Sequence, residues 1–243
     1  MKSIALIPAR YAASRFPGKL MQQLGDKSII RHSYENTVNT LLFDEVIVVT
    51  DSDIIFKEIV ENGGYALMSK KEHESGSDRI AEAAADIQAD VIVNVQGDEP
   101  FVKKEPLQRL LRVFQNDEKK HIQVASLMHE IHDDNLIADP NSVKVVIDKD
   151  WNALLFSRSV IPYKRDKSAK TVYYKHIGIY GYRRKALLDF TNMPVSTLEA
   201  TEKLEQLRYL ENGIKIRMVL TNESPVSIDT PEDLDKARRR GFS

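Results

Sequence analysis

Short apolar runs alternate with helix-like stretches over about the first hundred residues. The runs SIALIPA, EVIVVT and DVIVNV are nearly continuous in apolar residues and end in turn-forming or charged residues. Strands buried on both faces of a parallel sheet have this pattern. Helical periodicity lies between them at Ser28–Leu42, Asp53–Asn62 and Asp78–Gln88, and Gly63-Gly64 marks a helix end before a short strand, YALMS.

This alternation predicts an α/β fold with a doubly wound, mostly parallel sheet. Such sheets bind ligands at the carboxyl ends of their strands. The segment Arg10–Lys19, Asp51 and Asp98 all follow predicted strands. We therefore expect these residues to lie at one edge of the sheet.

The second half of the chain has a different pattern. VKVVIDKDWNALLFSR predicts a β-hairpin turning at Lys149-Asp150, and YYKHIGIYGYRR predicts an aromatic-rich strand. The stretch 196–213 predicts one long helix, with a capping box of Ser196 and Glu199 and a stop at Asn212-Gly213. A strand at KIRMVL and a final helix that begins at Thr230-Pro231 follow. The simplest organisation is one domain over residues 1–243 with an inserted β-hairpin element, a β-rich insertion near 140–182.

The amino-acid composition argues against several classes of protein function. The chain has 243 residues, 42% hydrophobic residues and a formal net charge of −1, which argues against a nucleic-acid or membrane-surface partner. It has no cysteine, so disulfides, thiolate nucleophiles and cysteine-bound metals are excluded. The opening apolar stretch is too short for a signal peptide, and no run approaches a membrane helix. We expect a cytoplasmic protein.

The loop PARYAASRFPGK concentrates positive charge. Arg10, Arg15 and Lys19 lie within it, and no acidic residue precedes Asp26. Three cations suit a triphosphate, whose charge is spread over many oxygens. The alternative is a solvated basic loop paired with distant acids. The loop has a single glycine, Gly18, so it is neither a P-loop nor a dinucleotide fingerprint, which disfavours a nicotinamide enzyme.

Two carboxylates follow or precede predicted elements at the same edge. Asp98 lies in NVQGDEP, directly after a buried strand, and Asp229 lies in SIDTPED, before a helix. Mg²⁺ binds one or two carboxylates together with substrate phosphates and water. Alternatively, Asp98 is only a turn residue and Asp229 only serves a helix N-terminus.

Seven motifs, in this order along the chain, carry a resemblance: IPARYAASRFPGK, ESGSDRI, VNVQGDEP, FSRSVIPY, KHIGIYGYR, LEQLR and IDTPEDL. Together they resemble the 3-deoxy-manno-octulosonate (Kdo) cytidylyltransferases. The resemblance implies a usually dimeric nucleotidyltransferase fold and a homodimer here. It implies the reaction of CTP with Kdo to give CMP-Kdo and diphosphate, with Mg²⁺, for lipopolysaccharide biosynthesis. The β-rich insertion would then serve sugar binding and dimerisation.

The resemblance also implies roles for single residues. The catalytic residues would be Arg10, Arg15, Lys19, Asp98 and Asp229, of which the two aspartates would bind metal. The nucleotide would be bound by Arg10, Arg15, Lys19, Ser75, Gly76 and Arg79. The sugar acid would be bound by Gln96, Arg158, His176, Tyr180, Glu205 and Gln206.

Other interpretations remain open at this point. From the residues alone, structural roles are favoured for His176 and Tyr180, and a solvated helix face for Glu205 and Gln206; only the resemblance favours sugar binding. The same chemistry on 8-amino-Kdo or a sialic acid is an alternative function. A catalytically silent nucleotide-binding module is another, although such a module has no need of two metal-binding carboxylates.

Overall fold

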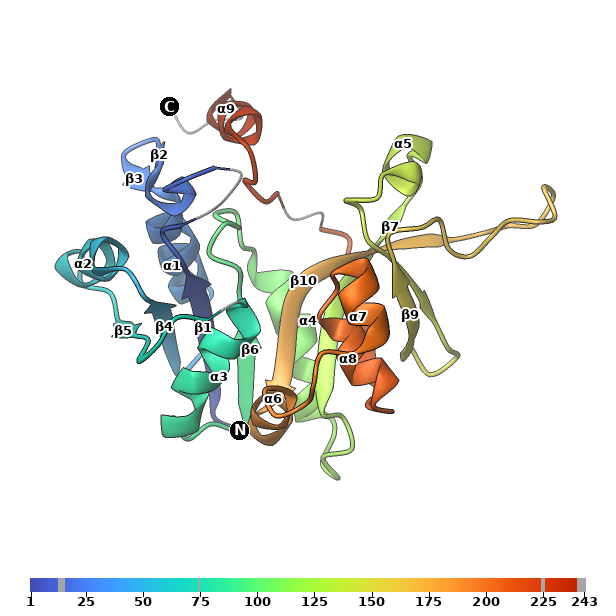
Figure 1. Ribbon diagram of the computed structural model, residues 1–243, viewed down its shortest axis with the longest axis horizontal. Helices are drawn as coiled ribbons and strands as arrows, with labels where there is room; N and C mark the ends of the chain where they lie inside the picture. The colour runs from blue at the N-terminus through green and yellow to red at the C-terminus, as the bar shows by residue number, and fades with distance from the viewer. Residues whose placement is uncertain (13–15, 74, 224–225, 240–243) are drawn as a thin grey trace. The chain divides into compact units, whose positions relative to one another are not determined.

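In the computed structural model the described residues are 1–12, 16–73, 75–223 and 226–239 (Figure 1). The chain divides into two compact units, which we describe separately. The first unit comprises residues 1–108 and 225–243, and the second comprises residues 109–224. Among the described residues no helix is long and apolar enough to cross a membrane.

The first unit contains a parallel sheet with the strand order β6-β1-β4-β5. Its strands are β1 (Ser3–Ala9), β4 (Glu45–Thr50), β5 (Ala66–Met68) and β6 (Val91–Asn94), each at a predicted position. All residues of β1 and β6 are buried, as their continuous apolar sequences require.

Three helices join these strands: α1 (Ile29–Asn39), α2 (Asp53–Glu61) and α3 (Gly76–Asp86). All three predicted helices are confirmed. The α2 stop is also confirmed, because Gly63 has a φ of 80° and follows the last turn of the helix. The rest of the unit comprises the 3₁₀ turn η1 (Lys19–Met21), the hairpin β2 (Gln23–Leu24) and β3 (Lys27–Ser28), and α9 (Pro231–Arg239).

The second unit has a mixed sheet with the strand order β11-β7-β10-β8-β9. The strands are β7 (Val124–Ile131), β8 (Lys144–Ile147), β9 (Ala153–Ser157), β10 (Tyr173–Arg183) and β11 (Ile216–Leu220). The predicted hairpin is confirmed as β8 and β9, which pair antiparallel. The helices are α5 (Asp134–Ala138), α6 (Arg184–Phe190), α7 (Thr197–Glu202) and α8 (Gln206–Glu211), while α4 (Lys104–Gln115) contains the boundary between the units.

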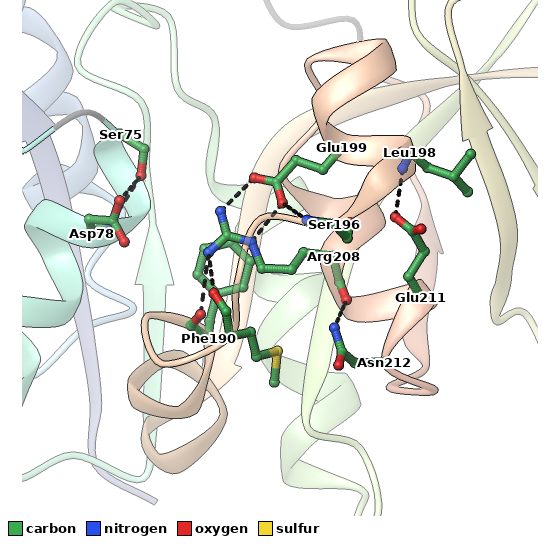
Figure 2. Close-up of polar contacts among 10 residues, drawn as sticks. Ser75, Asp78, Phe190, Ser196, Leu198, Glu199, Arg208, Glu211 and Asn212 are labelled. Carbon is green, nitrogen blue, oxygen red and sulfur yellow. Dashed lines mark hydrogen bonds and ion pairs between the residues drawn. The ribbon is translucent and has the colours of Figure 1, made fainter.

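The prediction of one long helix over 196–213 is wrong. The stretch forms two short helices, α7 and α8, separated at Lys203, whose φ of 55° is left-handed. A buried ion pair joins the two helices: Arg208 Nε lies 2.7 Å from Glu199 Oε2, and Nη2 lies 2.5 Å from Oε1 (Figure 2). The Arg208 guanidinium also stacks 4.1 Å from the centre of the Phe190 ring. Tertiary pairing therefore overrides the helical periodicity, and the break presents Glu205 at the start of α8.

Candidate active site

Lys19 is positioned by a tight turn after β1. Gly18 has a φ of 65°, and its N–H donates to the Tyr11 carbonyl at 3.1 Å. A Cβ at this position would lie 3.4 Å from the Tyr11 ring, and the left-handed backbone disfavours other residues. Glycine therefore lets the loop close on Tyr11 and start η1 at Lys19.

Asp98 follows β6 in a loop that packs closely against the end of β1. A Cβ on Gly97 would lie 3.1 Å from the Pro8 carbonyl oxygen, so any other residue would have to push this backbone contact apart. The Ser33 hydroxyl of α1 donates to the Gly97 carbonyl at 2.8 Å. These contacts fix the backbone that carries the Asp98 carboxylate.

Asp229 is attached to the same loop through its neighbour, because the Ile228 N–H donates to the Asp98 carbonyl at 3.0 Å. The next residue caps α9, as predicted: Thr230 Oγ1 accepts from the Asp233 N–H at 3.2 Å, and Asp233 Oδ2 accepts from the Thr230 N–H at 3.1 Å. The cap and the backbone bond together place Asp229 beside Asp98.

The Lys19 ammonium connects the two aspartates. Its Nζ lies 2.6 Å from Asp98 Oδ2 and 3.0 Å from Asp229 Oδ1. Burial acts to lower the pKa of Lys19, but the charges and hydrogen bonds of Asp98 and Asp229 outweigh it and raise that pKa. Lys19 is therefore a cation at neutral pH, and the predicted convergence of three distant segments is present.

The other two predicted cations differ from Lys19. Arg10 is exposed directly after the last residue of β1. Arg15 lies outside the described residues, so its placement stays a prediction. Among the described residues of the basic loop, Lys19 thus contacts the acidic pair, whereas the Arg10 side chain is exposed to solvent at the end of β1.

The predicted cytidine-side residues lie at the start of α3. Ser75 caps this helix, since its Oγ accepts from the Asp78 N–H at 3.1 Å and donates to Asp78 Oδ2 at 2.9 Å (Figure 2). A Cβ on Gly76 would lie 3.3 Å from the Pro8 ring, which places the helix start against the end of β1. Arg79 is buried and forms an ion pair with Asp51, directly after β4. The first unit therefore brings Ser75, Gly76, Arg79 and Asp51 to the carboxyl ends of its strands.

The predicted sugar-facing residues divide between the units. Gln96 lies in the loop after β6 of the first unit, whereas the other five lie in the second unit. Whether Gln96 joins them around one substrate stays a prediction.

In the second unit, His176 and Tyr180 lie on β10 with ring centres 5.3 Å apart. Burial lowers the pKa of His176 to about 3, and burial, together with the negative charge of Glu205, raises that of Tyr180. Both side chains are therefore neutral at neutral pH. Gln206 is buried rather than part of a solvated face, and Glu205 is half-buried.

Arg158 is held by backbone carbonyls. Its Nε donates to the Glu202 carbonyl at 2.7 Å, and its Nη1 donates to the Pro140 carbonyl at 3.0 Å. The Glu202 carboxylate accepts from the Arg158 N–H at 2.9 Å. The guanidinium thus has a fixed orientation, which suits the bidentate recognition of a carboxylate.

Among the buried polar residues that were not predicted, Lys144 and Ser126 contact predicted sugar-side residues. Lys144 is fully buried in β8 and donates to the carbonyls of Asp139 at 2.8 Å and Arg158 at 2.7 Å; burial lowers its pKa. Ser126 is fully buried in β7 and contacts His176. The available signal was a single polar residue within each apolar strand, VKVV and VASLM.

Comparison with known proteins shows the family of this chain. The cytidylyltransferase family profile matches residues 4–216. A 3-deoxy-manno-octulosonate cytidylyltransferase of Flavobacterium johnsoniae is 61% identical over 98% of both chains. This chain belongs to the cytidylyltransferase family.

Further relatives give the same result. The corresponding Christiangramia forsetii cytidylyltransferase is 57% identical, over 97% of this chain and 95% of its own. A solved structure of a CMP:2-keto-3-deoxy-manno-octonic acid synthetase complexed with CTP superposes with a TM-score of 0.93 at 39% identity, covering 99% of this chain and 98% of that one. The predicted α/β cytidylyltransferase fold is confirmed.

Proposed function

We propose that this cytidylyltransferase transfers the CMP group of CTP to 3-deoxy-manno-octulosonate, forming CMP-Kdo and diphosphate. The observation that carries the proposal is the convergence of Lys19, Asp98 and Asp229 at the strand ends, in a chain whose relatives carry this enzyme name. The anomeric hydroxyl of Kdo attacks the α-phosphorus of CTP and releases its proton to solvent. Diphosphate leaves with the electrons of the broken P–O bond.

The chain contributes positioning and charge rather than a covalent nucleophile, as phosphoryl-type transfer allows. Lys19 exchanges a carboxylate partner for phosphate oxygens, and Arg10, together with Arg15, adds positive charge where the leaving diphosphate develops negative charge. Ser75, Gly76 and Arg79 form the cytidine side, with Asp51 holding the Arg79 guanidinium in place.

The acidic pair fits Mg²⁺. Two carboxylates converge on one cationic atom, and in the described part of the chain no group of three or more acidic or histidine side chains could hold a metal ion alone. Mg²⁺ suits such a site because it keeps waters and binds substrate phosphates besides one or two carboxylates. Asp98 and Asp229 would hold the ion, which supplies neutralisation of phosphate charge.

The sugar acid is recognised by the second unit. Arg158 is the cation for the Kdo carboxylate, because carbonyl contacts fix its guanidinium. His176 and Tyr180 are neutral hydrogen-bonding groups for hydroxyls, and Glu205 and Gln206 supply further acceptors and donors. Gln96, in the loop of the first unit that carries Asp98, is the remaining proposed sugar ligand.

The decisive assay measures diphosphate release with each of the four nucleoside triphosphates, in the presence of Kdo, 8-amino-Kdo or a sialic acid. We expect turnover with CTP and Kdo, dependent on Mg²⁺. Faster turnover with 8-amino-Kdo or a sialic acid would show that this sugar acid, and not Kdo, is the substrate. CTP binding without turnover would indicate a catalytically silent module.

The biological setting follows from this reaction. CMP-Kdo is an activated sugar for lipopolysaccharide synthesis, which implies a cytoplasmic enzyme supplied with CTP. We further propose a homodimer, and light scattering should then report twice the chain mass of 27.7 kDa. A mass equal to one chain at micromolar concentration would contradict the dimer.

A further inference from the structure

A fully buried serine on β7 contacts the predicted sugar-binding histidine. Ser126 Oγ lies 3.0 Å from His176 Nε2, 3.1 Å from the Ile177 carbonyl oxygen and 3.0 Å from the Ile179 carbonyl oxygen. These carbonyls lie where the register between β10 and β7 shifts, between Ile177 and Tyr180. The serine hydroxyl therefore contacts two β10 carbonyls at an irregularity of the strand pairing.

Counting the donors and acceptors around Ser126 Oγ decides which ring nitrogen of His176 carries the proton. Ser126 also hydrogen-bonds the Tyr180 side chain, whose hydroxyl can donate to Oγ. A serine hydroxyl has one proton to donate, and carbonyl oxygens only accept. If His176 Nε2 lacked a proton, Oγ would face three acceptors with a single proton. If Nε2 carries the proton, it donates to Oγ, and the hydroxyl proton goes to a carbonyl. Only the second arrangement lets Ser126 satisfy the ring and a carbonyl together.

We propose that Ser126 is a positioning residue that fixes His176 as the Nε2–H tautomer, leaving Nδ1 as a hydrogen-bond acceptor for a hydroxyl of the sugar acid. This inference rests on the proposed function, because it takes His176 as a sugar-facing residue. It deepens that function by assigning the atom, and the polarity, with which His176 recognises the substrate.

The surroundings of the ring support a neutral, fixed imidazole. Phe156 packs edge-on against it, with ring centres 5.0 Å apart, and Tyr180 packs from the strand itself. Burial, with a smaller contribution from Lys175, holds the pKa of His176 at about 3. A neutral acceptor attracts a hydroxyl and not a carboxylate, so the carboxylate of the substrate belongs at Arg158.

The tautomer is tested without substrate. Long-range ¹H–¹⁵N correlation spectra of ¹⁵N-histidine-labelled protein distinguish protonated from unprotonated ring nitrogens, and His176→Gln identifies the His176 signals. We expect Nε2 protonated and Nδ1 unprotonated in the unaltered protein, and an altered signature in Ser126→Ala. A protonated Nδ1 in the unaltered protein would overturn the proposal, whatever the enzyme's activity.

Recognition is tested by steady-state kinetics. Ser126→Ala should raise the KM for Kdo about tenfold, the equivalent of one hydrogen bond, while the KM for CTP and kcat change less than about twofold. Ser126→Thr retains the hydroxyl and should restore most of the affinity. The matched control is Ser3→Ala, which removes another buried strand hydroxyl, one that donates to Leu42.

Failure of this proposal and failure of the proposed function would give different results. An unchanged KM for Kdo in Ser126→Ala would overturn the assignment of Nδ1 to the substrate. If Ser126→Ala does not fold, Ser126→Thr and the spectrum of the unaltered protein decide instead. Absence of turnover with every sugar acid would refute the proposed function, whereas the tautomer measurement would still decide how Ser126 sets the ring.

Discussion

Lys19 is the point on which the two acidic residues of the candidate active site converge. Its side chain is 13% exposed, against 26% for Asp98 and 53% for Asp229, so the Asp98 contact is the less screened of the two ion pairs. Asp98 therefore has the larger share in fixing Lys19, and its proposed role as a metal ligand can be tested separately.

Replacement of Asp98 by asparagine tests this role. Asp98→Asn keeps the side-chain shape but removes the charge, and we expect diphosphate release to fall by at least about a hundredfold, as when a preorganised electrostatic group is lost. Circular dichroism should show an unchanged fold. Asp235→Asn, which neutralises an exposed carboxylate paired with Arg238, is the control. Near-normal turnover of Asp98→Asn would refute the metal assignment.

The pKa of His176 makes the free energy of unfolding depend on pH. Its pKa is about 3 in the folded protein, below the ordinary 6.5, so between these values the unfolded chain binds more protons than the folded one. Stability is thus fully present above pH 6.5 and falls as the pH drops toward 3. At pH 5 the loss from this residue is about 2 kcal/mol.

Urea unfolding at pH 7.5 and pH 5.0 measures that loss. The unaltered protein should lose about 2 kcal/mol more than His176→Gln over this interval, because glutamine does not titrate. The comparison of two pH values within each protein cancels any constant effect of the substitution. Equal losses in both proteins would show that His176 is not held neutral.

At the level of elements, the Glu199–Arg208 pair shapes the segment that carries Glu205 and Gln206. Arg208→Met leaves the Glu199 carboxylate buried without its partner, and we expect a loss of about 3–5 kcal/mol in the free energy of unfolding. Glu199→Gln combined with Arg208→Met removes both charges and should recover part of that loss. Urea unfolding of the single and double variants measures the coupling.

The same pair predicts a kinetic effect. If it holds the break between α7 and α8, the double variant should show a raised KM for Kdo with little change in the KM for CTP. A double variant as unstable as Arg208→Met, or one with an unaltered KM for Kdo, would contradict this account of the break.

This break also shows what sequence patterns could not supply. Strands β1, β4, β5, β6, β10 and β11, the first three helices and the β8–β9 hairpin follow from apolar periodicity and turn residues, because local sequence decides them, whereas β7 was not predicted. The division at Lys203 depends on a pairing between residues nine positions apart in sequence, Glu199 and Arg208, together with the Phe190 ring. Lys144 and Ser126 escaped prediction for a similar reason: their partners are carbonyls and a ring from other segments.

The candidate active site was likewise predictable from sequence only in part. Motifs identified Lys19, Asp98 and Asp229, and the structure adds the left-handed turn at Gly18 and the close backbone approach at Gly97. What the motifs could not state is that Lys19 contacts both carboxylates, since that depends on how the Asp229 segment is joined to the Asp98 loop through Ile228. The role of Arg79 likewise required its partner, Asp51, to be seen.

At the scale of the whole molecule, the two substrates have largely separate sets of proposed ligands, with Gln96 as the one proposed sugar ligand in the first unit. The nucleotide-binding residues and both aspartates have sequence positions in the first unit, whereas Arg158, His176, Tyr180, Glu205 and Gln206 belong to the second. Binding of CTP and binding of Kdo should therefore respond to different substitutions, even though turnover requires both.

Calorimetry with Lys19→Met and Arg158→Met tests this division, since each variant replaces a cation by an apolar chain. With Mg²⁺ present, Lys19→Met should weaken CTP binding at least about tenfold, because it removes a charge-assisted hydrogen bond to phosphate. In calorimetry, Arg158→Met should leave CTP affinity within about twofold. In steady-state kinetics, the same variant should raise the KM for Kdo at least about tenfold. If Arg158→Met weakened CTP as strongly as Lys19→Met does, nucleotide binding would depend on both units, and the assignment of Arg158 to the sugar carboxylate would fail.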